Sequence, residues 1–276
     1  MNFSYHTIFN LLVFVYVSSA IGYFLFFTTQ KKKFGSLGFV LAFSGWILHT
    51  GLVVYRCLVF KSFAVSGLYE SLSFFAWVIV LVYLISEFRH KQHIDGVFVL
   101  PLAVSLAAYA SVINSDIKPL PAVLRSPWMA VHVTLCFLSY ACFTLAFCFA
   151  VMYIWQEKEL KSRKVDVFFF RLPALEFLDR LGYRAIVFGF VFLSLGIVSG
   201  SIWAQKAWGT FWSWDPKETF SLILWLIYLV YLHGRLMAFW RGKKSARLAI
   251  IGFAIMIFTY LGVSFLLPGL HSYISK

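Results

Sequence analysis

The sequence predicts an all-α integral membrane protein, a bundle of about eight transmembrane helices forming a single polytopic membrane domain over residues 1–276. Three observations support this fold class. Hydrophobic residues make up 61% of the chain and charged residues only 13%, with a mean hydropathy of +0.83. Apolar runs long enough to cross a bilayer recur along the sequence. The basic residues are distributed unequally between the segments that join these runs. A soluble domain of this size could not bury so much apolar surface.

The apolar runs set the expected helices in order. Their approximate limits are 8–27, 37–56, 69–86, 94–113, 129–154, 185–203, 219–239 and 248–267. The N-terminus lacks the basic region of a cleavable signal peptide, so we expect the first run to remain as a membrane helix. This arrangement places the loops 28–36, 87–93, 155–184 and 240–247 on one side of the membrane, and both termini on the other.

The charges of the connecting segments predict the orientation. The four loops on one side carry sixteen Lys and Arg residues, whereas the opposite side carries six. Cationic loops stay in the cytoplasm, so both termini are expected on the outer (periplasmic) side. The net charge of +13 therefore reflects membrane topology, and no nucleic-acid partner is expected. A multi-pass membrane protein is therefore expected.

The longest predicted cytoplasmic loop contains an amphipathic segment, 165–184. Apolar residues at positions 172, 175, 178 and 181 recur every third residue. This spacing favours a short helix lying on the membrane surface. A partner-docking helix is the alternative interpretation.

A tryptophan-rich loop at 203–218 lies on the predicted outer face. It places Trp208, Trp212 and Trp214 within seven residues. Asp215 is expected to be an N-cap with Pro216 and Glu218 at the first and third helical positions, so a helix should begin here. The tryptophans fit either an ordinary interfacial belt or a platform for a flat apolar ligand.

Four histidines are candidate metal ligands. His49 and His233 fall inside predicted spans, where an ionisable side chain is a functional candidate; a hydrogen bond to a neighbouring helix is the alternative. His132 and His271 fall at the outer surface, on either side of the tryptophan loop in sequence. A neutral imidazole is a good axial ligand for haem iron, and two pairs would suit two haem sites. The four cysteines form neither CxxC nor CxxCH, so no dithiol or attached c-type haem is expected.

These residues resemble a known family. The segment Trp208-Gly-Thr-Phe-Trp-Ser-Trp-Asp-Pro-Lys-Glu218 is similar to the WWD signature of haem-handling proteins. The wider pattern is closest to the CcsA (ResC) family of system II cytochrome c biogenesis. Besides the signature, the similarity rests on the segments 46–50, 67–71, 127–132, 172–179 and 269–273.

The resemblance implies that His49 and His233 receive haem b within the membrane, and that His132 and His271 ligate it at the outer face beside Trp208, Trp212, Trp214 and Asp215. It implies that the chain exports haem and presents it for attachment to CxxCH apocytochromes c. In this role the chain would be the haem-binding subunit of a cytochrome c haem lyase (synthase), active only with a CcsB/ResB-like partner. It also implies a bacterial inner (cytoplasmic) membrane or a thylakoid membrane as the location. As point charges, Lys206, Lys217 and Arg125 are candidates to meet the propionates. Alternatives are a b-type electron-transfer protein, a CcmC-like relative that presents haem, and a regulator of haem synthesis.

Overall fold

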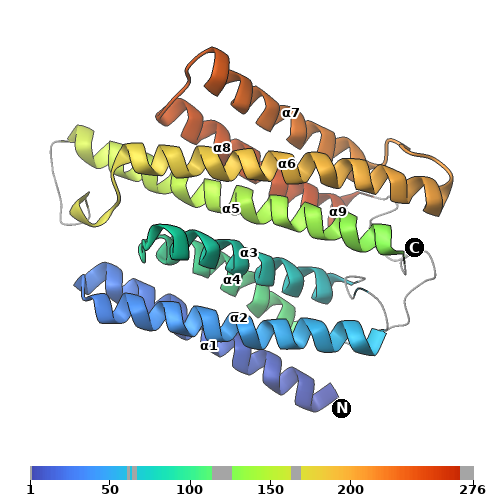
Figure 1. The fold of residues 1–276 in the computed structure, drawn as a ribbon, viewed down its shortest axis with the longest axis horizontal. Helices are drawn as coiled ribbons and strands as arrows, with labels where there is room; N and C mark the ends of the chain where they lie inside the picture. The colour runs from blue at the N-terminus through green and yellow to red at the C-terminus, as the bar shows by residue number, and fades with distance from the viewer. Residues whose placement is uncertain (1, 61–62, 64–66, 114–125, 163–168, 268–276) are drawn as a thin grey trace. The chain divides into compact units, whose positions relative to one another are not determined.

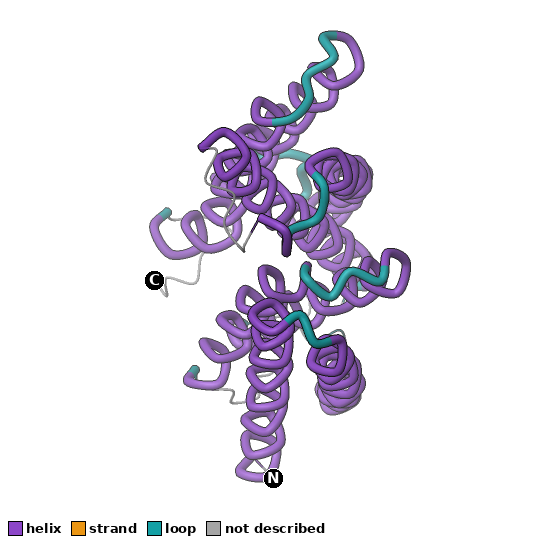
Figure 2. The backbone as a smooth tube through the Cα atoms, turned by 90° about the vertical axis from the view of Figure 1, so that its left-hand side faces the viewer, coloured by secondary structure: helices purple, strands orange, loops and turns teal. Residues whose placement is uncertain are grey.

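The computed structural model describes residues 2–60, 63, 67–113, 126–162 and 169–267. Throughout these ranges the regular structure is helical, with no strand (Figure 2). Eight helices are long and apolar enough to cross a membrane, which confirms the predicted fold class. The orientation with both termini outside stays a prediction from the loop charges. We call the end of a helix that these charges place outside its outer end, and the opposite end its inner end.

The chain divides into two compact units, Met1–Arg125 and Ser126–Lys276. The first contains α1 (Asn2–Thr29), α2 (Lys32–Phe60), α3 (Leu68–His90) and α4 (Asp95–Val112), drawn from blue to green in Figure 1. The second contains α5 (Pro127–Ser162), the short turn η2 (Phe169–Arg171), α6 (Leu175–Trp208), α7 (Pro216–Met237), α8 (Lys243–Ile257), the π-helical segment η3 (Phe258–Gly262) and α9 (Val263–Leu266).

In the first unit α1 packs against α2 and α4, and α3 packs against α4. Helices α1 and α2 come very close at two small residues, because a methyl group added at Gly22 would lie 3.1 Å from the backbone of Gly38. The Ser19 hydroxyl donates to the Gly38 carbonyl oxygen at 2.7 Å. Small residues and short polar contacts of this kind are how membrane helices associate, since lipid supplies no hydrophobic drive between them.

A buried ion pair ties the outer ends of α2 and α3 together. Arg56 bonds to Glu70, and both side chains are almost completely buried. The Arg56 guanidinium lies 5.1 Å from the ring centre of Tyr5 and 5.0 Å from that of Tyr69, within the range of cation–π attraction. The segment 67–71, one of those that carry the family resemblance, therefore contributes Tyr69 and Glu70 to the contacts of α3 with α1 and α2.

In the second unit α5 and α6 pack along much of their length, and α8 packs against α5 and α7. The core is aromatic: Phe143 of α5 stacks on Tyr228 of α7 at 3.7 Å between ring centres, and Phe147 on Phe253 of α8 at 4.0 Å. Stacked aromatic pairs such as these add to area burial and fix α7 and α8 against α5.

The helix limits differ from the sequence-based ones around the predicted loop 155–184. Helix α5 continues to Ser162 and α6 already begins at Leu175. The described part of the amphipathic segment 165–184 is thus the turn η2 and the start of α6, continuous with the span. With 34 residues and 1.5 Å of rise per residue, α6 is about 51 Å long, well beyond the roughly 30 Å of a hydrocarbon core. A hydropathy pattern cannot mark the point where such a helix leaves the bilayer.

Candidate functional site

The tryptophan-rich loop ends in a complete helix cap. The Asp215 carboxylate accepts a hydrogen bond from the Lys217 backbone N–H at 3.1 Å, and Pro216 occupies the first turn. Glu218 reaches back to accept from the Asp215 N–H at 3.2 Å and from the Ser213 N–H at 2.8 Å. This confirms the predicted start of α7. The same hydrogen bonds also hold Ser213 and Asp215, the two residues on either side of Trp214.

Trp214 adopts a left-handed backbone conformation, with φ of 58°. A bulky residue in this region costs energy and persists only where the surroundings hold it. The Glu218 carboxylate supplies that restraint through the flanking Ser213 and Asp215 N–H groups. The Trp214 side chain is 68% exposed and meets Trp212 edge-to-face at 5.8 Å. The left-handed backbone at Trp214 therefore goes together with an indole that projects from the loop.

The tryptophans form two edge-to-face pairs rather than one flat stack. Trp212 pairs with Trp214, while Trp208 meets Trp203 at 5.9 Å and an interplanar angle of 71°. Trp203, near the end of α6, is only 6% exposed. Its ring lies nearly parallel to His132, at 16° and 6.3 Å between centres. The sequence marked Trp203 only as the start of the loop, and its pairing with His132 becomes visible once α5 and α6 are packed.

His132 is held on α5 by two glycines of α6. Its Nδ1 lies 2.8 Å from the carbonyl oxygen of Gly196. A carbonyl oxygen only accepts, so Nδ1 carries the hydrogen and a neutral ring has its lone pair on Nε2. A methyl group at Gly200 would lie 2.6 Å from Nδ1, so only glycine leaves room for the ring. Nε2 makes no hydrogen bond with the part of the chain that the structure describes.

A lysine and a π-helical segment complete this end of the second unit. The Lys217 ammonium donates to the Ser264 hydroxyl at 3.1 Å, and Ser264 donates to the Tyr260 carbonyl oxygen at 2.9 Å. Tyr260 lies in η3, a type of helix irregularity common at functional sites. Among the described residues Lys217 forms no ion pair within 4.0 Å. Lys206 instead lies over the Trp128 ring at 5.3 Å.

Two of the predicted site residues at the outer face, His271 and Arg125, lie outside the described residues. The structure therefore brings His132, Trp203 and Trp208 together, and separately Trp212, Trp214 and Asp215 within the loop.

His49 has a quite different environment from His132. It is fully buried in the first unit. Its Nδ1 lies 3.2 Å from the Tyr16 hydroxyl, and its Nε2 lies 2.9 Å from the Ser73 hydroxyl. Both ring nitrogens are thus engaged by side chains of α1 and α3. Coordination of a metal by His49 requires one of these hydrogen bonds to open.

His233 belongs to the second unit, on α7, and its side chain is exposed. It stands in a stripe of exposed apolar residues at helical spacing. The other members of this stripe are Leu226, Leu229, Val230, Leu236 and Met237. The His233 ring makes no hydrogen bond with the described part of the chain. An imidazole on an apolar face is poorly solvated by lipid, so His233 is a candidate functional residue.

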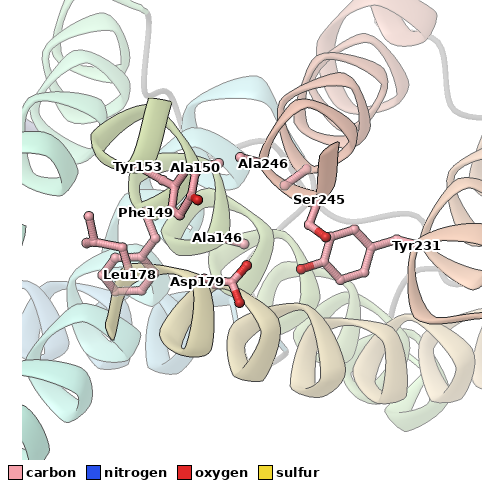
Figure 3. Close-up of a pocket in the computed structure, with 11 residues that line it drawn as sticks. Ala146, Phe149, Ala150, Tyr153, Leu178, Asp179, Tyr231, Ser245 and Ala246 are labelled. Atoms are coloured by element: carbon pink, nitrogen blue, oxygen red, sulfur yellow. The ribbon is translucent and has the colours of Figure 1, made fainter. Parts of the chain in front are cut away.

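An ion pair that the sequence did not single out closes the inner end of the second unit. The Asp179 carboxylate accepts from both Arg235 Nη atoms at 2.8 Å and from the Gly242 backbone N–H at 3.0 Å. This joins α6 to the end of α7 and the start of α8. Figure 3 shows Asp179 beside Tyr231 and Ser245 at a small cavity of about 20 Å³, enough for a water molecule and far too small for haem.

Comparison with known proteins gives the family. A family model described as cytochrome C assembly protein matches residues 65–271, which include His132, His233 and the whole tryptophan loop. The cytochrome c biogenesis protein CcsA of Prochlorococcus marinus (strain MIT 9301) is 39% identical, covering 82% of this chain and 81% of that protein. CcsA of Heterosigma akashiwo is 38% identical over 79% of both chains, and CcsA of Trieres chinensis is 33% identical over 99% of this chain and 96% of its own length.

A solved structure with a similar fold is titled cytochrome c heme lyase CcmF. It aligns with a TM-score of 0.63 at 16% identity, covering 91% of this chain. The chain spans 46% of the length of that protein, so the likeness concerns the fold alone. The family match across most of the chain and relatives at 33% to 39% identity establish that this multi-pass membrane protein belongs to the cytochrome c assembly family, with CcsA proteins of cytochrome c biogenesis as its relatives.

Proposed function

We propose that the chain carries haem b across the membrane and presents it at the outer face for covalent attachment to apocytochromes c with a CxxCH motif. In this role it is the haem-binding subunit of a cytochrome c synthase that works with a CcsB-like membrane partner. The observation that carries the proposal is the hydrogen bond from His132 Nδ1 to the Gly196 carbonyl oxygen, because it prepares the opposite ring nitrogen to bind iron.

The chemistry of His132 fits an axial ligand. A histidine that binds a metal through one nitrogen usually donates its other N–H to a carbonyl or carboxylate, which fixes the ring and makes the coordinating nitrogen more basic. Here the backbone of α6 supplies that carbonyl, and Trp203 lies parallel to the ring. His271 is the proposed second axial ligand of the same iron.

The surrounding loop fits the rest of the haem molecule. Porphyrin is a flat apolar ring, and Trp208, Trp212 and Trp214 offer indole surface that the fold leaves partly or largely exposed. Lys217 is the proposed partner of a propionate, because its half-buried ammonium bonds only a hydroxyl within the described residues. Lys206 and Arg125 are the other candidates; the contact of Lys206 with the Trp128 ring makes it the weaker match.

His49 and His233 are the proposed inner haem ligands, which haem from the cytoplasm reaches first. The exposed apolar stripe around His233 would bury a porphyrin face. Binding at His49 requires Tyr16 or Ser73 to release one ring nitrogen. A hydroxyl–imidazole bond contributes only about 0.5–1.5 kcal/mol net, so an iron–nitrogen bond can replace it.

The attachment step needs no group from this chain beyond haem positioning. Each cysteine S–H of the apocytochrome adds across one vinyl double bond, with sulfur bonding to one carbon and hydrogen to the other. No atom leaves and no external electron is needed for the addition itself. The chain's contribution is therefore to hold the vinyl edge of the ring toward the incoming peptide and keep both axial positions of iron filled.

The test is co-expression of the chain with its CcsB-like partner and a CxxCH apocytochrome, followed by staining for covalently bound haem. The unaltered chain is expected to give stained cytochrome, His132→Ala is expected to give none, and His90→Ala, at the inner end of α3, serves as the matched histidine control. Normal maturation by His132→Ala at equal membrane level would overturn the assignment. A purified chain with fixed stoichiometric haem and no effect on cytochrome maturation would instead favour the b-type electron carrier.

A further inference from the structure

A cluster of acidic, tyrosine and histidine side chains lies at the inner end of the first unit, apart from every residue assigned to haem above. It gathers Tyr23 of α1, Glu87 of α3, His93 of the following connection and Asp95, the first residue of α4. Neither the family signature nor the proposed function gives these residues a role.

Glu87 is the centre of the cluster. Its side chain is only 2% exposed, yet both carboxylate oxygens are bonded. Oε2 accepts from the Tyr23 hydroxyl at 2.6 Å and Oε1 lies 2.5 Å from His93 Nδ1. The Tyr23 distance is within the range of a charge-assisted O–H···O hydrogen bond, and the His93 distance is shorter than the usual N–H···O one. The His93 side chain is 25% exposed, so it connects the buried carboxyl group to the surface.

Asp95 differs from Glu87 because it is buried without hydrogen-bond partners among the described residues. It is 1% exposed, and neither of its carboxylate oxygens has a hydrogen-bond partner in the described part of the chain. Its chain neighbour Gly96 packs against Tyr23, because a methyl group added there would lie 2.7 Å from the Tyr23 ring, and the Tyr23 hydroxyl donates to Glu87. An isolated carboxylate without partners is too costly to bury, and such a group takes up a proton instead.

In the described part of the chain, the side chains of the neighbouring elements supply no counter-charge. Facing groups are Tyr23 from α1, the backbone of Gly35 from α2, Tyr83 from α3 and Gly96 from α4; a methyl group at Gly96 would lie 2.4 Å from the Tyr83 hydroxyl. Among the described residues no Lys or Arg pairs with Glu87 or Asp95. Nor do the described His, Cys, Asp and Glu side chains form a group of three suited to a metal ion.

We propose that Glu87 and Asp95 form a proton-binding carboxyl pair that exchanges its proton, through His93, with water at the inner end of the first unit. The imidazole takes a proton from water on Nε2 and releases the one on Nδ1 to Glu87 Oε1, so the carboxyl pair gains one proton. Every proton gained by the pair is one lost by water, so the exchange needs no other reactant. The ligand of this site is the proton, and the inference stands independently of haem binding.

Infrared difference spectroscopy of the purified full-length chain in lipid tests the proposal. A protonated carboxyl group is expected to give a carbonyl-stretch band at neutral pH that shifts in heavy water. Isotope labelling of aspartate carboxyl groups in the unaltered chain should move this band if Asp95 carries the proton, or labelling of glutamate if Glu87 does, which requires no folding of a variant. Asp95→Asn and Glu87→Gln should each remove or alter the band, whereas Glu176→Gln at an exposed position should leave it.

His93→Gln isolates the exchange path. The band is expected to remain, because the carboxyl pair is intact, but its hydrogen–deuterium exchange should become slower. A spectrum with no protonated-carboxyl band at neutral pH would overturn the proposal, as would a band that survives in both Asp95→Asn and Glu87→Gln. Loss of the band on addition of magnesium or sodium ions at constant pH would identify a metal-cation site instead. Unchanged exchange in His93→Gln would remove His93 from the path.

Discussion

His132 and Gly196 are joined by a hydrogen bond of 2.8 Å between the imidazole Nδ1 and the carbonyl oxygen. The bond crosses from α5 to α6 and determines which ring nitrogen is free. His49, by contrast, has both nitrogens engaged by hydroxyl groups. Two of the histidines that the sequence marks as candidate ligands therefore differ. His132 Nε2 makes no hydrogen bond among the described residues, whereas His49 would have to release a hydroxyl partner before either ring nitrogen is free.

The close packing of Gly200 on His132 gives the first prediction. Gly200→Ala places a methyl group 2.6 Å from Nδ1, so the ring must move and its bond to Gly196 is expected to break. Haem content of the purified protein, measured as pyridine haemochrome per protein, should fall. The matched control is Gly182→Ala on the same helix, whose added methyl group lies at an ordinary 3.7 Å from Phe149. Equal haem content in the two variants would show that the position of the ring is unimportant.

The tryptophans should separate into two functional groups. Trp203 is buried against His132. Trp203→Ala is therefore expected to lower the free energy of unfolding by about 3–5 kcal/mol, as other buried large-to-small changes do. The haem content should fall as well. Trp203→Phe keeps an aromatic ring and should be milder. Trp214→Ala, at an exposed position, should lower haem content with little change in melting temperature. Comparable stability losses in Trp203→Ala and Trp214→Ala would contradict this division.

The cap of α7 predicts a modest stability effect. Asp215→Ala is expected to cost about 0.5–2 kcal/mol, the usual value for a lost N-cap. Glu218→Gln weakens the bonds to Ser213 and Asp215 and should relax the left-handed Trp214. Glu159→Gln, in the last turns of α5, is the control, because an acidic residue there gains nothing from the helix dipole. Thermal unfolding in detergent measures the stability of all three variants. A Glu218→Gln variant as stable as Glu159→Gln would show that the hydrogen bonds of Glu218 do not stabilise the loop.

The Asp179–Arg235 pair should contribute far more than a surface pair. Both side chains are largely buried, and the carboxylate accepts three N–H groups. Asp179→Asn leaves Arg235 without its counter-charge, and removal of one partner from a buried pair costs about 3–5 kcal/mol. Lys161→Ala removes an exposed i,i+4 pair with Glu157 and is expected to cost no more than about 0.5 kcal/mol. A double-mutant cycle on Asp179 and Arg235 measures their coupling, and a coupling near zero would contradict the geometry.

The features that the sequence predicts well are those encoded locally. The eight spans follow from hydropathy, and the start of α7 follows from Asp215, Pro216 and Glu218, which lie within four residues of one another. The predicted end of α5 and start of α6 are wrong, because the part of a helix that continues past the membrane surface is no longer apolar and gives no hydropathy signal. The stacking of Trp203 on His132, the Arg235 partner of Asp179 and the hydroxyl partners of His49 all join residues distant in sequence. They depend on helix packing, which no local pattern records.

The most direct test of haem ligation by His132 is the absorption or resonance Raman spectrum of haem that co-purifies with the protein. With two axial imidazoles the unaltered chain should give a six-coordinate low-spin spectrum. His132→Ala is expected to lose haem from the outer site or to convert it to a five-coordinate high-spin form, and added imidazole should restore the low-spin spectrum. An unchanged low-spin spectrum and unchanged haem content in His132→Ala would contradict the account.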